Sequence, residues 1–241
     1  MQTRRPRSAA VKAPATGGAA GPEMPAAGVD EFYRRLAEAA PEPRSELDFA
    51  DPYTLLVAVV LSAQSTDAGV NRATASLFRE APTPHAMLEL GEEGLRDRIK
   101  TIGLFNTKAK NVIALSRILV EQHAGRVPDE RAALELLPGV GRKSANVVLN
   151  VAFGQPTIAV DTHVFRVANR TGLARGSTPL LVETALLRRT PERWLSHAHH
   201  WLILHGRHIC QARRPRCADC IVRELCLFEP KTDAPATTPR P

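Results

Sequence analysis

The spacing of apolar and polar residues is helical along the central part of the chain. It predicts helices that begin near Asp30, Asp51-Pro52, Asp67, Asn106, Asp129, Gly141, Asp161 and Pro191. Aspartate before such a run is typical of an N-cap, and proline is tolerated in the first turn of a helix. No segment alternates with a period of two, and only residues 156–160 read as extended. The expected fold class is therefore all-α.

Both ends of the chain differ from this pattern. Residues 1–28 are rich in Ala, Pro, Gly and Arg and show no periodicity, so we expect a disordered basic tail. Residues 229–241 contain Pro230, Pro235 and Pro239 and predict a second loose end. The Arg-rich start is compatible with an organelle transit peptide. We favour a solvated tail that adds weak affinity for phosphates, and a bacterial, cytoplasmic and nucleoid-associated protein.

Composition narrows the class of protein further. The 241 residues are 44% hydrophobic and 24% charged, which is typical of a globular protein and excludes a collagen-like or wholly disordered one. The longest apolar run, residues 55–61, is far shorter than the about 20 residues that cross a bilayer, so no membrane partner is expected. The net charge of +7 favours a polyanionic partner such as nucleic acid.

A short glycine-rich turn joins two predicted helices. It reads Leu137-Pro138-Gly139-Val140-Gly141, with Arg142 next in the chain. Glycine allows a positive φ and the close approach of another backbone. The N–H groups that begin the second helix point outward and bind anions well. The turn is therefore either an ordinary helix–helix connection or a helix–hairpin–helix that holds a DNA phosphate without reading a base.

Two ionisable residues close to this turn suggest chemistry. Lys143 falls in the first turn of the second helix, where the helix dipole disfavours an extra cation and makes the amine a better nucleophile. Asp161 stands where an N-cap is expected and needs no other role. Beside an amine nucleophile, it gains a second interpretation: stabilising positive charge on a sugar that is losing its base.

All four cysteines lie close together near the end of the chain, at Cys210, Cys217, Cys220 and Cys226. Such clustering favours a metal centre over disulfides. Structural zinc sites usually contain two short-spaced ligand pairs, whereas only one Cys-x2-Cys occurs here. Four thiolates also suit a [4Fe-4S] cluster. The spacing alone leaves zinc and iron–sulfur equally open.

These motifs together resemble the endonuclease III family of DNA repair glycosylases. The resemblance rests on residues 137–145, on Val160-Asp161-Thr162-His163, on residues 61–67, and on residues 200–206 leading into the four cysteines. It covers about residues 30–228. It implies a six-helix domain over 45–155, with the helix–hairpin–helix at 131–150. It also implies a discontinuous cluster domain over 29–44 and 156–228, with the active-site cleft between the two.

The resemblance also implies roles for single residues. Lys143 is expected to be the Schiff-base nucleophile and Asp161 its carboxylate partner. The cysteines are expected to hold one [4Fe-4S] cluster per chain. Residues expected to contact DNA are Gln64, Leu137, Gly139, Val140, Gly141, Arg142, Arg213, Arg214 and Arg216. The implied reaction removes a damaged, oxidised pyrimidine from double-stranded DNA and cuts the strand at the abasic site by β-elimination. Gln64 is also open to interpretation as a buried polar core residue.

Three other interpretations remain. An adenine-mismatch glycosylase of the same superfamily relies on a glutamate where this chain has Val59. An 8-oxoguanine glycosylase generally lacks the cysteines. A non-catalytic DNA-binding scaffold needs neither Lys143 nor Asp161. Five histidines between His197 and His208 suggest packing or DNA-edge residues more than a further metal site. No oligomer signal is present, so a monomer is expected.

Overall fold

The computed structural model describes residues 21–232, and these form ten α-helices, a single 3-10 turn and no β-strand. The expected all-α class is confirmed. Within the same residues, no helix is both long enough and apolar enough to pass through a bilayer.

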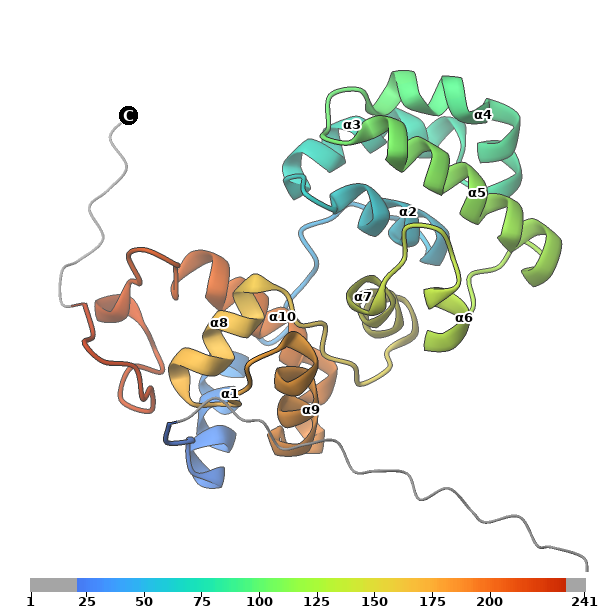
Figure 1. Ribbon diagram of the computed structural model, residues 1–241. Helices are drawn as coiled ribbons and strands as arrows, with labels where there is room; N and C mark the ends of the chain where they lie inside the picture. The colour runs from blue at the N-terminus through green and yellow to red at the C-terminus, as the bar shows by residue number, and fades with distance from the viewer. Residues whose placement is uncertain (1–20, 233–241) are drawn as a thin grey trace, which may run out of the picture.

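Six consecutive helices surround the first hydrophobic core (Figure 1). They are α2 (Pro52–Ser62), α3 (Asp67–Glu80), α4 (Pro84–Ile99), α5 (Phe105–His123), α6 (Arg131–Glu135) and α7 (Arg142–Phe153). Helix α2 is apolar on all sides because it runs through the middle of this group, and residues 53–61 are all buried.

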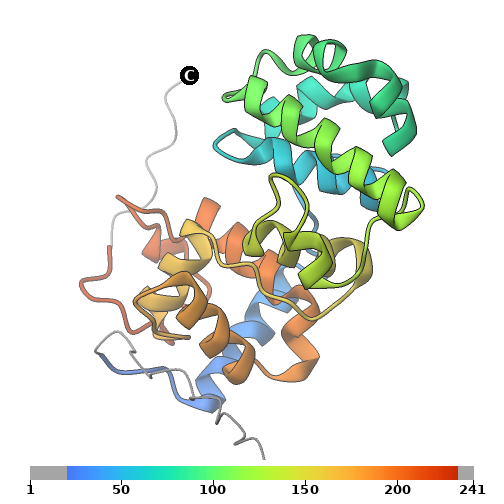
Figure 2. The same cartoon turned by 45° about the vertical axis from the view of Figure 1, so that its right-hand side comes forward.

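The second core joins the beginning of the described chain to its end. Helix α1 (Ala26–Ala39) packs with α8 (Thr162–Thr171), α9 (Pro179–Arg189), α10 (Glu192–His208) and the 3-10 turn η1 (Cys217–Asp219). Figures 1 and 2 both show α1 among these later helices, apart from α2 to α7. Aromatic side chains hold α1 in place: Tyr33 lies 6.3 Å from Trp201, and Phe32 lies 6.3 Å from His205, ring centre to ring centre.

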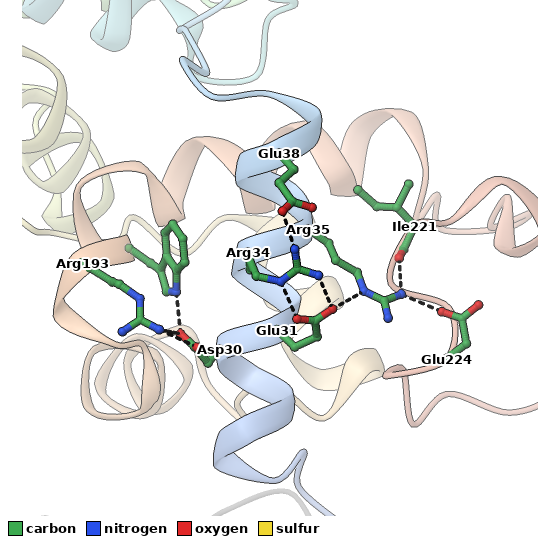
Figure 3. A network of polar contacts seen from close by, with 9 residues as sticks. Asp30, Glu31, Arg34, Arg35, Glu38, Arg193, Ile221 and Glu224 are labelled. Carbon is green, nitrogen blue, oxygen red and sulfur yellow. Dashed lines mark hydrogen bonds and ion pairs between the residues drawn. The ribbon is translucent and has the colours of Figure 1, made fainter.

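Polar contacts of α1 reinforce this packing (Figure 3). Arg35 donates to the main-chain oxygen of Ile221 and to Glu224, both at 2.8 Å. The carboxylate of Asp30 accepts from the Trp194 indole at 2.8 Å and pairs with Arg193. Our prediction that Asp30 caps this helix was wrong. The helix begins at Ala26, so Asp30 lies inside it and faces α10 instead.

Residues 21–28 are part of the fold, although the composition placed them in the basic tail. Met24 is buried, and its N–H donates to the oxygen of Gly172 at 2.8 Å. Arg175 and Arg189 also hold this segment, through the oxygens of Pro22 and Met24. The rest of the tail, residues 1–20, and residues 233–241 lie outside the described chain.

Most predicted helix starts are confirmed, including those near Asn106, Gly141 and Pro191, where no side chain caps the helix. Asp51 forms a capping box with Thr54, and Asp161 accepts from two N–H groups of α8. Asp129 was a wrong prediction, because Glu130 is the N-cap residue of α6 and no side chain caps that helix. Helices α4 and α9 were not predicted at all, although Thr83-Pro84 and Thr178-Pro179 are standard starts.

Two of the histidines on α10 are buried deeply enough to stay neutral in mildly acidic solution. Burial lowers the pKa of His199 and of His205 to about 4, from an ordinary value of 6.5. Nδ1 of His199 lies 3.1 Å from the oxygen of Ala159, and the His205 ring packs against Phe32. Both rings pack against the second core, and Nε2 of His205 also lies 3.7 Å from the sulfur of Cys220.

This burial predicts loss of stability in acid. The unfolded chain binds a proton at each histidine near pH 6.5, whereas the folded chain does so only near pH 4. The free energy of unfolding therefore falls as pH drops from about 6.5 to 4, by up to about 3 kcal/mol for His199. Urea unfolding across this pH range measures the loss. The variant His199→Gln should show a flatter dependence and the exposed-site variant His197→Gln an unchanged one. Equal slopes for His199→Gln and wild type would contradict the assignment.

Candidate active site and cysteine centre

The predicted hairpin is present between α6 and α7, and its two glycines have different functions. Gly139 has φ of 81°, and a Cβ there would lie 2.9 Å from the Asn111 amide nitrogen and 3.2 Å from Val60. Gly141 is the N-cap of α7 with φ of −101°, and a Cβ there would meet nothing within 4 Å. Only Gly139 needs the left-handed conformation. Gly141 keeps the surface around the helix start open.

The other hairpin residues likewise include some that support the fold and some that remain exposed. The side chains of Leu137 and Val140 are buried in the first core, and their N–H groups donate within the turn at 3.0 Å. They shape the hairpin and leave no donor for a ligand. Helix α7 has no side-chain cap, so its first N–H groups are without intrahelical partners. Leu136, at the hairpin tip, is 80% exposed.

A cavity of about 280 Å³ lies between the two cores, and Lys143 is on its wall. Helix α7 contributes Lys143, Ser144, Val147 and Val151, and α10 contributes His199, His200, Ile203, Leu204 and Arg207. Residues 44–47, which connect α1 to α2, cover one side. Val59 and Gln64 also line the cavity, so it joins residues from most of the motifs in the sequence.

Three charged groups meet beside this cavity. Burial raises the pKa of Asp67, the positive charge of Lys143 opposes that rise, and the negative charge of Asp161 adds to it. The same two residues act on the buried ring of His199. Lys143 begins α7, whereas Asp161 begins α8, so helix starts from two different cores bring an amine and a carboxylate together.

Asp161 is an N-cap, but capping uses only one of its oxygens. Oδ1 accepts from the N–H groups of His163 at 2.9 Å and Val164 at 2.8 Å. Within residues 21–232, Oδ2 accepts no hydrogen bond. The carboxylate is thereby fixed in orientation and still has an oxygen available for another partner.

Gln64 stands at the rim of the cavity and is exposed, so it is not a buried core residue. Its φ is 54°, which is uncommon for a residue other than glycine. Leu104 has the same feature, with φ of 57°, and is 55% exposed. The two loops adjoin, because a Cβ on Gly103 would lie 3.5 Å from the Gln64 oxygen and Lys108 donates to Ser65 at 2.8 Å.

The predicted arginines have different surroundings. Arg213 and Arg214 are exposed, and neither has an ion pair with the rest of the described chain. Arg216 pairs with Asp219 at 2.8 Å. Arg142 forms a two-pronged pair with the buried Glu183 of α9, at 2.7 and 3.0 Å, and thereby ties α7 to the second core.

The four cysteines line one small cavity of about 20 Å³, and none forms a disulfide. Burial raises the pKa of Cys220 to about 11 and also raises that of Cys226, so bare thiolates are unfavourable there. A bound cationic centre reverses this effect. In the described residues, no three His, Cys, Asp or Glu side chains are arranged to hold a single metal ion.

Helix α8 holds the loop that carries these cysteines. Arg166 donates to the oxygen of Cys210 at 2.9 Å and to that of Gly206 at 2.7 Å. Arg170 donates to the oxygens of Gln211 and Ala212 at 2.7 and 2.6 Å, and one of its nitrogens lies 3.8 Å from the Cys210 sulfur. The helix that begins at Asp161 thus also orders the cysteine loop.

Several residues at the cavity were not predicted. Asp67 accepts from Arg207 at 2.5 Å, and Arg207 also pairs with Glu46 of the connecting segment. Asp67 belongs to a motif that we quoted, but nothing local to it indicates its partner 140 residues later. The exposure of Leu104 and Leu136 was also not predicted. Apolar residues in a helical pattern are normally expected in the core, so only the structure reveals that these two are exposed.

Comparison with known proteins gives a consistent result. Residues 57–192 match the model of the HhH-GPD superfamily base excision DNA repair proteins. Endonuclease III of Escherichia coli is 59% identical over 203 residues, 84% of this chain and 96% of that protein. Endonuclease III of Rickettsia conorii is 58% identical over 200 residues, 83% and 95% of the two chains. A solved trapped endonuclease III–DNA covalent intermediate matches with a TM-score of 0.79 at 42% identity, covering 85% of this chain and 96% of the other.

The hairpin geometry predicts that replacing one of its two glycines lowers the stability and that replacing the other does not. Gly139→Ala forces a positive φ on alanine and a clash with Asn111, so we expect the free energy of unfolding to fall by about 1–3 kcal/mol. Gly141→Ala should keep the stability of the wild type to within about 0.5 kcal/mol, since its φ is ordinary and the space is open. Urea denaturation measures both. Equal losses in the two variants would contradict this division of roles.

Proposed function

The chain belongs to the endonuclease III family of the HhH-GPD superfamily, and we propose that it excises oxidised pyrimidines from duplex DNA and then cuts the strand at the abasic site. The observation that carries this proposal is that Lys143 lines the cavity between the two cores, and that the charges of Lys143 and Asp161 both act on Asp67 and His199 at its wall. An amine and a fixed carboxylate are the two groups that such a reaction needs.

DNA binding begins at the hairpin in this proposal. The uncapped start of α7 offers N–H donors and the positive end of the helix dipole to one phosphate. Because Leu137 and Val140 use their N–H groups internally, we assign the phosphate contact to the main chain around Gly141. The exposed Arg213 and Arg214 add phosphate contacts, so affinity falls with rising salt. Arg142 acts mainly as the link to Glu183. The enzyme works as a monomer.

Flipping the damaged base leaves a gap in the duplex. Gln64 lines the cavity, and the exposed Leu104 lies on the adjoining loop. We propose that Gln64 fills the gap and that the exposed Leu104 wedges between neighbouring bases, as apolar side chains do in proteins that unstack DNA. The flipped base then enters the cavity.

The reaction joins the Lys143 amine to the sugar. Nζ bonds to C1′, the bond from C1′ to the base breaks, and its electron pair leaves with the base, which takes up a proton. Asp161 stabilises the positive charge that develops on the sugar. The sugar ring then opens: the C1′–O4′ bond breaks, O4′ takes up a proton that Nζ has lost, and C1′ and Nζ form the double bond of a Schiff base. This Schiff base acidifies C2′, and loss of a C2′ proton expels the 3′ phosphate, which cuts the strand.

We propose that the cysteines hold one [4Fe-4S] cluster. Their gathering around one cavity supports it. Membership of the endonuclease III family favours a multi-iron centre over zinc. Such a cluster supplies iron–thiolate bonds that order the loop. The chain's own contribution is the loop and its support by Arg166, Arg170 and Arg35.

The alternatives explain less. Val59 lines the cavity where the adenine-mismatch enzymes need a glutamate, and a valine cannot transfer a proton. A DNA-binding scaffold has no need for a carboxylate oriented by two N–H groups beside a lysine. We therefore retain the glycosylase and lyase proposal.

Replacing Lys143 tests the nucleophile directly. Borohydride reduces a Schiff base to a stable amine, so wild-type protein with duplex DNA containing one abasic site should give a covalent adduct. Lys143→Ala should give none while still binding the DNA, and the exposed-lysine control Lys110→Ala should match wild type. The adduct is measured on a denaturing gel. An undiminished adduct in Lys143→Ala would move the nucleophile to another amine.

Asp161→Asn separates capping from catalysis. Asparagine caps helices as well as aspartate does, so the free energy of unfolding should change by less than about 1 kcal/mol. Loss of the negative charge should slow strand cutting by about 100-fold or more under single-turnover conditions. Asp51→Asn changes another N-cap that is outside the cavity and should keep full activity. Wild-type cutting by Asp161→Asn would leave Asp161 as a cap alone.

A further inference from the structure

His200 differs from the other buried histidines of α10 because it has no hydrogen bond. It is 8% exposed, and its Nδ1 is fully buried without a partner among residues 21–232. Its ring contacts the His199 ring, with centres 5.4 Å apart. His199 itself approaches the Ala159 oxygen at 3.1 Å. A buried polar atom without a partner costs about 1–3 kcal/mol. The His200 ring also lines the cavity that contains Lys143, so a ligand in this cavity can reach the ring.

The position of His200 relative to Lys143 indicates which part of a ligand it would meet. Lys143, Val147 and Val151 lie at four-residue intervals along α7, so the cavity extends about two helical turns away from Lys143. His200 and Val151 also line the adjoining cavity near Gly154 at the far end of α7. His200 therefore lies at the inner end, whereas Lys143 lies where the reacting sugar must be.

The remaining surroundings suit a flat, partly polar ring. The cavity of about 280 Å³ is at the lower limit of the roughly 300–1,000 Å³ of small-molecule sites. Val59, Val147, Ile203 and Leu204 supply apolar contacts. Burial, with the nearby His197, lowers the pKa of His200, so the imidazole is neutral at physiological pH. A neutral imidazole offers one donor and one acceptor nitrogen.

We infer that His200 hydrogen bonds to the pairing edge of the flipped pyrimidine and so determines which damaged bases are excised. The inference rests on the proposed function and adds the residue that reads the base. A base whose C1′ is held at Lys143 directs its pairing edge inward, toward the end of the cavity where His200 lies. His200 is thus needed for excision, whereas cutting at a site that has already lost its base requires nothing from it.

Two activities of the full chain test the inference. One duplex carries 5-hydroxyuracil and another carries an abasic site. His200→Leu keeps similar bulk and removes the polar atoms, so base excision should fall by about 10- to 100-fold, the equivalent of one or two hydrogen bonds. Cutting at the abasic site should stay within about twofold of wild type. The control His197→Leu, an exposed position one turn away, should retain both activities.

A second readout separates base recognition from packing. 5-Hydroxycytosine and 5-hydroxyuracil differ only at positions 3 and 4 of the pairing edge. The ratio of their excision rates should change by more than about threefold in His200→Leu and in His200→Gln, since each alters the donor and acceptor offered to that edge.

Several outcomes would overturn the inference. An equal loss of excision and abasic-site cutting would mean that His200 only supports the fold, and His200→Gln repeats the comparison if His200→Leu proves unstable. Unchanged excision with an unchanged ratio would mean that another residue reads the base. Failure of the wild-type chain to excise either base would instead refute the proposed function itself.

Discussion

The two groups proposed to react lie on separate hydrophobic cores, so the site depends on polar contacts that hold these cores in register. One such contact is the pair between Arg142 and the buried Glu183. It joins the residue before Lys143 to α9. Removing Arg142 would leave the buried carboxylate of Glu183 without its partner, which is destabilising. The neighbouring amide of Asn150 adds three donations, to the oxygens of Gln155, Thr157 and Ser196.

Helix α8 connects the carboxylate of Asp161 to the cysteine loop. Its first turn is capped by Asp161, and its later turns carry Arg166 and Arg170, which bind main-chain oxygens of the cysteine loop. The carboxylate and the loop are therefore ordered by one rigid element. Arg35 supports the loop from α1, which explains why a helix so early in the chain belongs to the second core.

The sequence allowed good predictions wherever a signal is local. Asp51 and Asp161 cap their helices because the N–H groups they accept from are only two or three residues ahead. Asp30 failed because the helix begins four residues earlier, at Ala26, and the buried Val29 continues it into the second core. Helix α4 was missed since Gly91, with φ of 73°, interrupts its periodicity. Single cap residues therefore predict a helix start only when the preceding residues cannot continue the helix.

Partners distant in sequence were beyond local reasoning. Nothing near Arg142 indicates that its guanidinium pairs with Glu183, 41 residues later. The same limit applies to Asp67 with Arg207, and to His200, whose interest depends on which groups fail to reach it. Motif resemblance identified Lys143 and Asp161 as a pair. The residues that shape the cavity between them required the structure.

Two strained backbone conformations near the cavity rim reduce the stability of the fold. Within residues 21–232, three residues other than glycine have positive φ, and two of them, Gln64 and Leu104, lie on adjoining loops at this rim. Each conformation costs of order 1 kcal/mol that glycine would avoid. Glycine, however, has no side chain to project into a duplex. Retaining glutamine and leucine in these strained positions agrees with the proposal that their side chains contact DNA outside the fold.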